Sequence, residues 1–148
     1  MFFVDTSALA KRYVAEVGST WVRQQVRPSA QNRIVVADLL RVEMLALFAR
    51  HRRLNTIPAN TVSSIRNTFL KHYRTQYWVI QIDRSILLTA GRLVDKHPLR
   101  TLDAVQLACA LRAVGTLPQA ITFVSADNNL LTAATTEGFA TDNPINHP

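Results

Sequence analysis

The chain has little glycine and lacks several motifs on which common active sites depend. Its 148 residues include only four glycines, and it contains neither a Walker loop nor a glycine-rich dinucleotide fingerprint. There is no Gly-x-Ser-x-Gly motif, and the four histidines show neither His-Glu-x-x-His spacing nor a cysteine pair with which to bind zinc. These absences argue against a nucleotide cofactor, a serine hydrolase of the nucleophile-elbow type and a zinc enzyme.

Cysteine and long apolar runs are scarce as well. The single cysteine, Cys109, cannot form an internal disulfide and lies among small apolar residues, so we expect it in the core. No apolar stretch approaches the roughly 20 residues that cross a bilayer, and the first residues do not resemble a signal peptide. No repeat or linker divides the sequence. We therefore expect a cytoplasmic protein with no membrane partner and a single domain over residues 1–148.

Acidic residues are the scarcer charged type. Ten Asp and Glu residues stand against 17 Lys and Arg residues, which gives a formal net charge of +7. If several acids gather in one pocket, the remaining surface is more basic still. A basic surface around an acidic pocket suits a polyanion bound near metal ions. The simpler alternative is that the basic residues only serve solubility.

Strand-like and helix-like patterns alternate along the chain. Strands are predicted at 2–4, 34–37, 79–82 and 121–124, with a short edge strand near 139–141. Helices are predicted at 7–17, 21–26, 39–53, from 58 or 60 to 73, and at 85–96, 102–114 and 128–137. Gly18 is predicted to end the first helix, and Ser19 to cap the second. The alternation predicts an α/β fold with a short parallel sheet flanked by helices.

Four acidic residues lie where a folded chain does not normally place a charge. Asp5 directly follows the apolar run 1–4, and Asp127 lies just past the apolar run 121–124. Ligands of open α/β sheets collect at the carboxyl ends of the strands, where we expect both acids. Glu43 and Asp103 interrupt apolar helical stripes, so their carboxylates share a face with core side chains.

Two of these acids also have a simple structural explanation. Asp103 and Asp127 each stand near the start of a predicted helix and can cap it.

If all four acids converge, two carboxylates about 4 Å apart repel by roughly 4 kcal/mol at an effective dielectric near 20. A divalent cation is the simplest compensation, and ligands that are all oxygen favour Mg²⁺ or Mn²⁺. This predicts phosphodiester hydrolysis. A haloacid-dehalogenase-type phosphatase is disfavoured, because Ser7 stands where its second aspartate is required.

Four segments in order resemble the motifs of the PIN-domain nucleases, specifically the VapC-type toxins. They are Phe3–Leu9, Glu43 on its helix, Arg100–Ala108, and Phe123–Asp127 followed by Leu130, Leu131 and Gly138. The segment Lys11–Ser19 is similar to one found in a subgroup of that family. The resemblance implies a PIN-like domain and a metal-dependent endoribonuclease of a type II toxin–antitoxin pair. It also implies RNA as substrate, a cognate antitoxin and frequent homodimers.

The resemblance also assigns roles to individual residues. Those implied to be catalytic and metal-binding are Asp5, Glu43, Asp103 and Asp127. Ser125 matches a small hydroxyl position, and Thr6 is expected to orient Asp5. The chain departs from the pattern at Gln106, where relatives often carry histidine. A second departure lies near the end of the chain, where some relatives have an additional acid; this chain has Asp142 there, which we treat as peripheral.

Basic residues near the acids are candidates for RNA binding. Arg100, Lys11 and Arg12 are expected to hold flanking phosphates, although ion pairs with the acids explain them equally well. The cluster 50–53 is better explained by its place at a helix C-terminus than by an RNA track. Two other functions stay open: a catalytically silent PIN-like module that binds RNA or antitoxin, and a PIN-type nuclease outside a toxin–antitoxin system.

Overall fold

Five parallel strands form the centre of the computed structural model, which describes residues 1–147. They are β1 (Phe2–Val4), β2 (Ile34–Ala37), β3 (Tyr77–Ile80), β4 (Thr122–Val124) and β5 (Ala140–Asp142). Their order in the sheet is β3-β2-β1-β4-β5, and every neighbouring pair is parallel. The predicted α/β class with a short parallel sheet is therefore confirmed.

Helices connect the strands. The α-helices are α1 (Thr6–Leu9), α2 (Ser19–Val26), α3 (Leu39–Arg53), α4 (Ala59–Thr75), α5 (Arg84–Lys96), α6 (Thr101–Thr116) and α7 (Asn128–Thr136). Three short 3₁₀ turns are η1 (Ala10–Arg12), η2 (Pro28–Ala30) and η3 (Pro144–Asn146). Across residues 1–147, no helix combines the length and apolar character that a membrane crossing requires.

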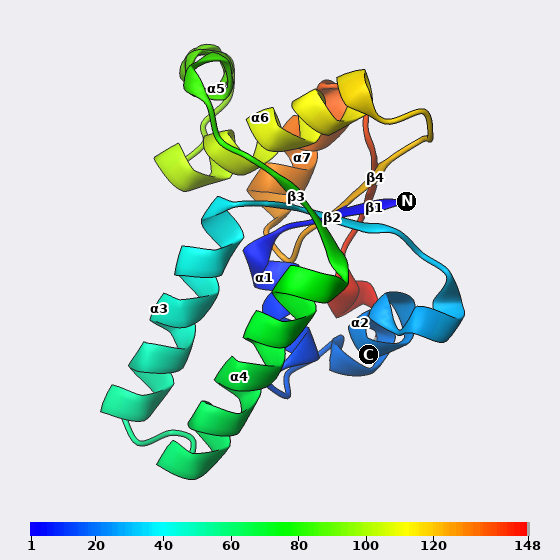
Figure 1. Cartoon of the computed structure of the whole chain (residues 1–148). Coiled ribbons are helices and arrows are strands. Elements are labelled where there is room, and N and C mark those ends of the chain that lie inside the picture. The colour runs from blue at the N-terminus through cyan, green and yellow to red at the C-terminus, as the bar shows by residue number, and fades with distance from the viewer. Residues whose placement is uncertain (148) are drawn as a thin grey trace.

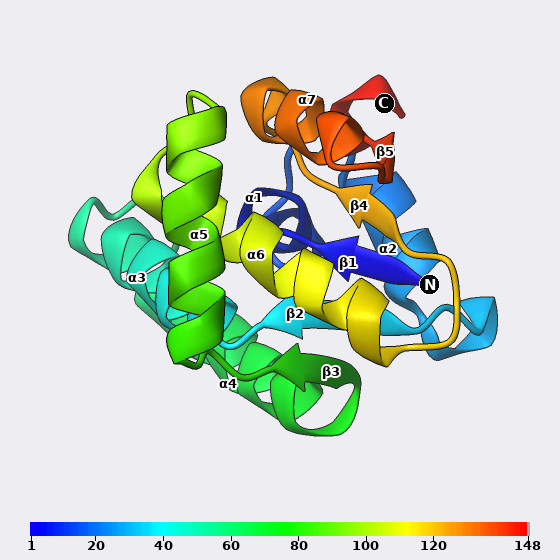
Figure 2. The same ribbon diagram turned by 90° about the horizontal axis from the view of Figure 1, so that it is seen from above.

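The two faces of the sheet bury two separate cores, because successive strand residues point to opposite faces. Phe3, Val35 and Phe123 pack with α5, α6 and α7 on one face, where Cys109 is fully buried as expected. Val4, Val36 and Val124 pack with α1 to α4 on the other. Figures 1 and 2 show the sheet between these two layers of helices. The charged side chains that follow the strands lie at the sheet's carboxyl edge.

The first predicted helix, 7–17, was too long. α1 ends at Leu9 and continues as η1 to Arg12, after which an irregular segment leads to Gly18. Gly18 has φ +85° and is the N-cap of α2, so Ser19 is the first residue of that helix rather than its cap. The Ser19 hydroxyl instead accepts a hydrogen bond from the Glu16 N–H at 2.9 Å and donates to the Val14 carbonyl at 3.2 Å. These bonds stabilise a turn where the sequence suggested a helix.

The third predicted strand was displaced by two residues. β3 starts at Tyr77, because Tyr77 to Ile80 pair in register with Ile34 to Ala37 of β2. Residues 81 and 82 connect to α5, which begins with Asp83 as its N-cap. Asp83 Oδ1 accepts a hydrogen bond from the Ile86 N–H at 2.9 Å. α6 also extends beyond its predicted end and includes Gly115.

Candidate functional site

A pocket of about 780 Å³ lies at the carboxyl edge of the sheet. Its walls come from the start of α1 and η1, from one face of α3, from the first turn of α6 and from the loop after β4. Asp5, Glu43 and Asp103 all line it, whereas Asp127 does not. The fold thus brings together three of the four predicted acids, which are separated in the sequence by up to 98 residues.

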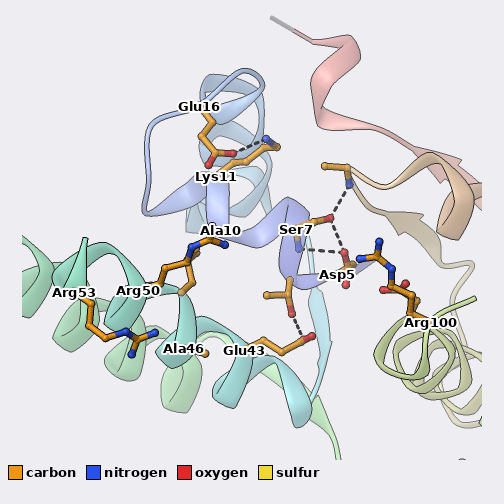
Figure 3. Close-up of a pocket in the computed structure, with 14 residues that line it drawn as sticks. Asp5, Ser7, Ala10, Lys11, Glu16, Glu43, Ala46, Arg50, Arg53 and Arg100 are labelled. Atoms are coloured by element: carbon orange, nitrogen blue, oxygen red, sulfur yellow. Dashed lines mark hydrogen bonds and ion pairs between the residues drawn. The ribbon is translucent and has the colours of Figure 1, made fainter. Parts of the chain in front are cut away.

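Asp5 lies on the floor of this pocket and is only 6% exposed. Its Oδ2 accepts hydrogen bonds from the Ser7 N–H at 3.1 Å, the Ser7 hydroxyl at 2.6 Å and the Ser125 hydroxyl at 3.1 Å. Burial raises the pKa of Asp5 in spite of these bonds, which act to lower it. Sequence reasoning missed Ser7, although an N-cap acid normally accepts from the backbone two or three residues later. Figure 3 shows Ser7 beside Asp5.

Glu43 projects from α3 and is held through one of its oxygens. The Thr6 hydroxyl and the Gln106 amide nitrogen both donate to Oε2, the latter at 2.8 Å. Gln106 also donates to the Thr6 hydroxyl at 3.1 Å. Thr6, which we expected to orient Asp5, therefore places its hydroxyl on Glu43. Burial raises the pKa of Glu43, and the charges of Asp5 and Asp103 raise it further, while the bonds from Thr6 and Gln106 lower it.

Asp103 and Asp127 differ in their surroundings. Asp103 lies in the first turn of α6, whose N-cap is Arg100, so Asp103 is not the N-cap. Burial raises the pKa of Asp103, as do the charges of Asp5 and Asp127. Asp127 is the N-cap of α7, and its Oδ1 accepts from the Asn129 and Leu130 N–H groups at 2.8 and 3.2 Å. The capping explanation thus accounts for Asp127 but not for Asp103.

The predicted RNA-binding residues lie in different environments. Arg100 lines the pocket. Lys11 also lines it but is buried and paired with Glu16 at 2.9 Å. Arg12 is not a lining residue, because its guanidinium donates to the Tyr77 hydroxyl at 2.5 Å and to the side chain of Gln76 at 2.9 Å. Its position gives no support to the expected phosphate contact.

Two arginines that sequence reasoning set aside do line the pocket. Arg50 and Arg53 project from α3 on the same face as Glu43 (Figure 3). Their spacing of seven and ten residues from Glu43 places them on its helical face, and that spacing is the signal we overlooked. Asp142, by contrast, lies in β5 and pairs with His147 at 2.8 Å outside the pocket.

The chemistry of the pocket acids fits a hard divalent cation. All of their donor atoms are oxygens, and burial and mutual repulsion disfavour their ionised forms. Within residues 1–147, no three His, Cys, Asp or Glu side chains are placed to hold one ion together. Mg²⁺ does not need such a cage, since it keeps several waters and usually takes only one or two carboxylates together with substrate phosphates.

Comparisons with known proteins agree with the motifs of the sequence. The PIN domain model matches residues 2–134. The fold is similar to that of PAE2754 from Pyrobaculum aerophilum, with a TM-score of 0.69, 16% identity, and coverage of 99% of this chain and 84% of that one. It is also similar to VapC20 of Mycobacterium tuberculosis, described as a toxin that cleaves the sarcin–ricin loop, with a TM-score of 0.63, 16% identity, and coverage of 95% and 97%. No curated protein sequence matches. The match over nearly its whole length shows that the chain belongs to the PIN-domain family.

Proposed function

We propose that the protein is a metal-dependent endoribonuclease and the toxin of a type II toxin–antitoxin pair. The observation that carries this proposal is the convergence of Asp5, Glu43 and Asp103 in one pocket, each with a raised pKa. Perturbed acids in a cleft are typical of functional sites. The basic side chains around the same pocket suit a phosphate backbone.

The residues of the pocket have distinct roles in this mechanism. A Mg²⁺ or Mn²⁺ ion in this pocket would supply Lewis-acid chemistry and activation of water at neutral pH. Asp5, Glu43 and Asp103 are the residues that would hold it, each directly or through a water, and Asp127 would add negative charge beside Asp103. Ser7 and Ser125 hold Asp5 through its Oδ2, and Thr6 and Gln106 hold Glu43 through its Oε2. Arg100 and Lys11 are the proposed phosphate contacts near the cut, and Lys11 would have to leave its ion pair with Glu16 to make one.

The toxin role adds two protein partners, a cognate antitoxin and a second copy of the chain. VapC20, to which the fold is similar, is itself described as a toxin. The surface offers apolar side chains for such contacts, since Leu87 and Leu88 of α5 are 54% and 62% exposed.

The first prediction is that the purified protein cuts RNA internally only when Mg²⁺ or Mn²⁺ is present. The acids repel one another without a cation, and the proposed mechanism relies on a metal ion to activate the water. Gel assays with structured and unstructured RNA, with and without EDTA, measure this. Cleavage that persists in EDTA contradicts the metal mechanism. The absence of cleavage with any divalent ion indicates a catalytically silent binding module. Equal cleavage of DNA would show that the enzyme is not specific for RNA.

A second prediction concerns Gln106. Its Nε2 holds Glu43, whereas its Oε1 is buried without a hydrogen-bond partner among residues 1–147. Gln106→Leu should therefore lower cleavage and Mn²⁺ affinity by about 10- to 100-fold. It should leave stability nearly unchanged, because the apolar side chain also removes the unpaired oxygen.

The matched variant Gln106→Glu separates positioning from packing. A second carboxylate beside Glu43 raises its pKa further, so the acidic limb of the pH–rate profile should move to higher pH. Melting curves and pH profiles of both variants test this. Full activity of Gln106→Leu, or an unmoved profile for Gln106→Glu, contradicts the positioning role.

A further inference from the structure

One face of α3 forms a continuous wall of the pocket. Its lining residues are Glu43, Ala46, Leu47, Arg50 and Arg53, at the helical spacing i, i+3, i+4, i+7 and i+10. The rise of an α-helix places Arg50 about 10 Å and Arg53 about 15 Å along the axis from Glu43. Between Glu43 and Arg50 this face carries the small, exposed Ala46 and the partly buried Leu47, neither of which is charged. The wall therefore leads from the acidic floor to two cations.

These two cations have no acidic partner. Neither Arg50 nor Arg53 makes an ion pair or a side-chain hydrogen bond with any other residue of the described chain, 1–147. Lys11 of the same pocket, in contrast, is neutralised by Glu16. The helix dipole favours basic residues throughout this last turn but does not select a face. Arg52 lies in the same turn and lines a different hollow, together with Val62 and Arg66.

The net charge of the pocket becomes positive when a divalent cation binds. Its lining carries four acidic side chains and four basic ones, which balance. A divalent cation makes the whole pocket net positive, and a positive cleft attracts a polyanion. In Figure 3, Arg100 lies on one side of Asp5 and Glu43, and Arg50 and Arg53 lie on the other. A strand whose phosphates contact both sides therefore passes over the acids.

We propose that Arg50 and Arg53 bind backbone phosphates of an unpaired RNA strand on one side of the cut. This rests on the proposed nuclease function and adds the path of its substrate. An unpaired strand fits best, because Asp5 is buried on the pocket floor and the scissile phosphate must descend to it. A flexible single strand does this without the deformation that a stiff duplex requires.

Binding in a salt series tests this path. Arg50→Ala, Arg53→Ala and the double variant are compared with Arg52→Ala, each in an Asp5→Asn background that does not cut. The probe is a short fluorescein-labelled oligouridylate. Each lost phosphate contact should make the log–log salt slope shallower by about 0.7, and should weaken binding at low salt by about tenfold. Arg52→Ala should change neither quantity, and the exposed arginines should not affect melting.

Cleavage assays on proteins that retain Asp5 distinguish a failure of the proposed RNA path from a failure of the proposed nuclease function. With Mn²⁺, the Arg50→Ala/Arg53→Ala double variant should raise KM for the same RNA and keep most of kcat. If the wild-type protein cuts RNA but the slopes stay unchanged, or Arg52→Ala lowers the slope equally, the proposed path is wrong and the nuclease stands. If the wild-type protein neither binds nor cuts RNA, both proposals fail.

Discussion

The Asp5→Asn variant is expected to lose RNA cleavage by at least about a hundredfold, the upper range for residues that only orient a metal ligand. The same variant should melt at a higher temperature than the wild-type protein in the absence of metal. Asparagine keeps an oxygen that accepts from Ser7 and Ser125, and it caps a helix as well as aspartate does. It removes one charge from a buried, repelling group. A gain in stability together with a loss of activity is the signature of an acid placed for a cation.

The pH dependence of stability should reveal the same charge. Burial raises the pKa of Asp5 above its ordinary value of 3.8 in the folded protein. Its stabilising contribution is therefore complete below that ordinary value and is lost as the pH rises through the raised pKa. The metal-free wild-type protein should become less stable from about pH 4 towards neutral pH, and Asp5→Asn should show a weaker decline. Mn²⁺ should stabilise the wild-type protein more than the variant.

Asp95→Asn is the matched control, because Asp95 is exposed on α5 and outside the pocket. It should cleave RNA and melt like the wild-type protein. Expression of the wild-type chain and of Asp95→Asn in a bacterium should arrest growth, whereas Asp5→Asn should not. A large loss of stability in Asp5→Asn would show that the Asp5 carboxylate serves to stabilise the fold. Equal toxicity of the wild-type chain and Asp5→Asn would contradict nuclease action as the cause of growth arrest.

Gly18→Ala is expected to destabilise the protein by about 2–4 kcal/mol, the largest effect on stability that we predict. Gly18 has φ +85°, and a Cβ there would lie 2.3 Å from the Pro144 carbonyl oxygen. The clash cannot be relieved by rotating a side chain, because the nearest atoms belong to the backbone of Pro144. The substitution must displace η3 or the segment that leads into α2.

Two other glycines provide matched controls for urea unfolding. Gly138 has φ +94° and open space where a Cβ would stand, so Gly138→Ala should cost only the backbone term of about 1 kcal/mol. Gly91 lies within α5 with nothing nearby, and Gly91→Ala should stabilise the protein by about 0.5–1 kcal/mol. If Gly18→Ala costs no more than Gly138→Ala, the close approach to Pro144 has no energetic weight.

The sequence predicted the elements that depend on local pattern. Helix α3 has the predicted limits, and β1 and β2 lie where their apolar runs are. The place of Asp5 on the pocket floor was also predictable because it follows a strand, as was the capping position of Asp127 after another strand, outside the pocket lining. Hydrophobic pattern and the geometry of parallel sheets were sufficient for these features.

Features that depend on distant contacts were not predictable in this way. The segment after Arg12 leaves the helix because Ser19 binds back to Val14 and because Gly18 packs against Pro144, far along the chain. Thr6 binds Glu43 across 37 residues, a pairing that neighbouring positions do not reveal. Arg50 and Arg53 of α3 are a different case, because their spacing from Glu43 was visible in the sequence. The helix dipole explains why basic residues lie at this helix end, but it does not explain why these two line the pocket.

The order of the strands links the pocket to protein synthesis. β1 pairs with β2 on one side and with β4 on the other, and β4 begins only at Thr122. Because a ribosome makes the N-terminus first, a nascent chain exposes Asp5 long before Ser125 exists to bind it. The edge of β1 that pairs with β4 therefore stays unpaired until β4 has been synthesised. In the nuclease proposed above, the pocket floor beneath Asp5 is therefore completed only after the C-terminal strands have emerged from the ribosome.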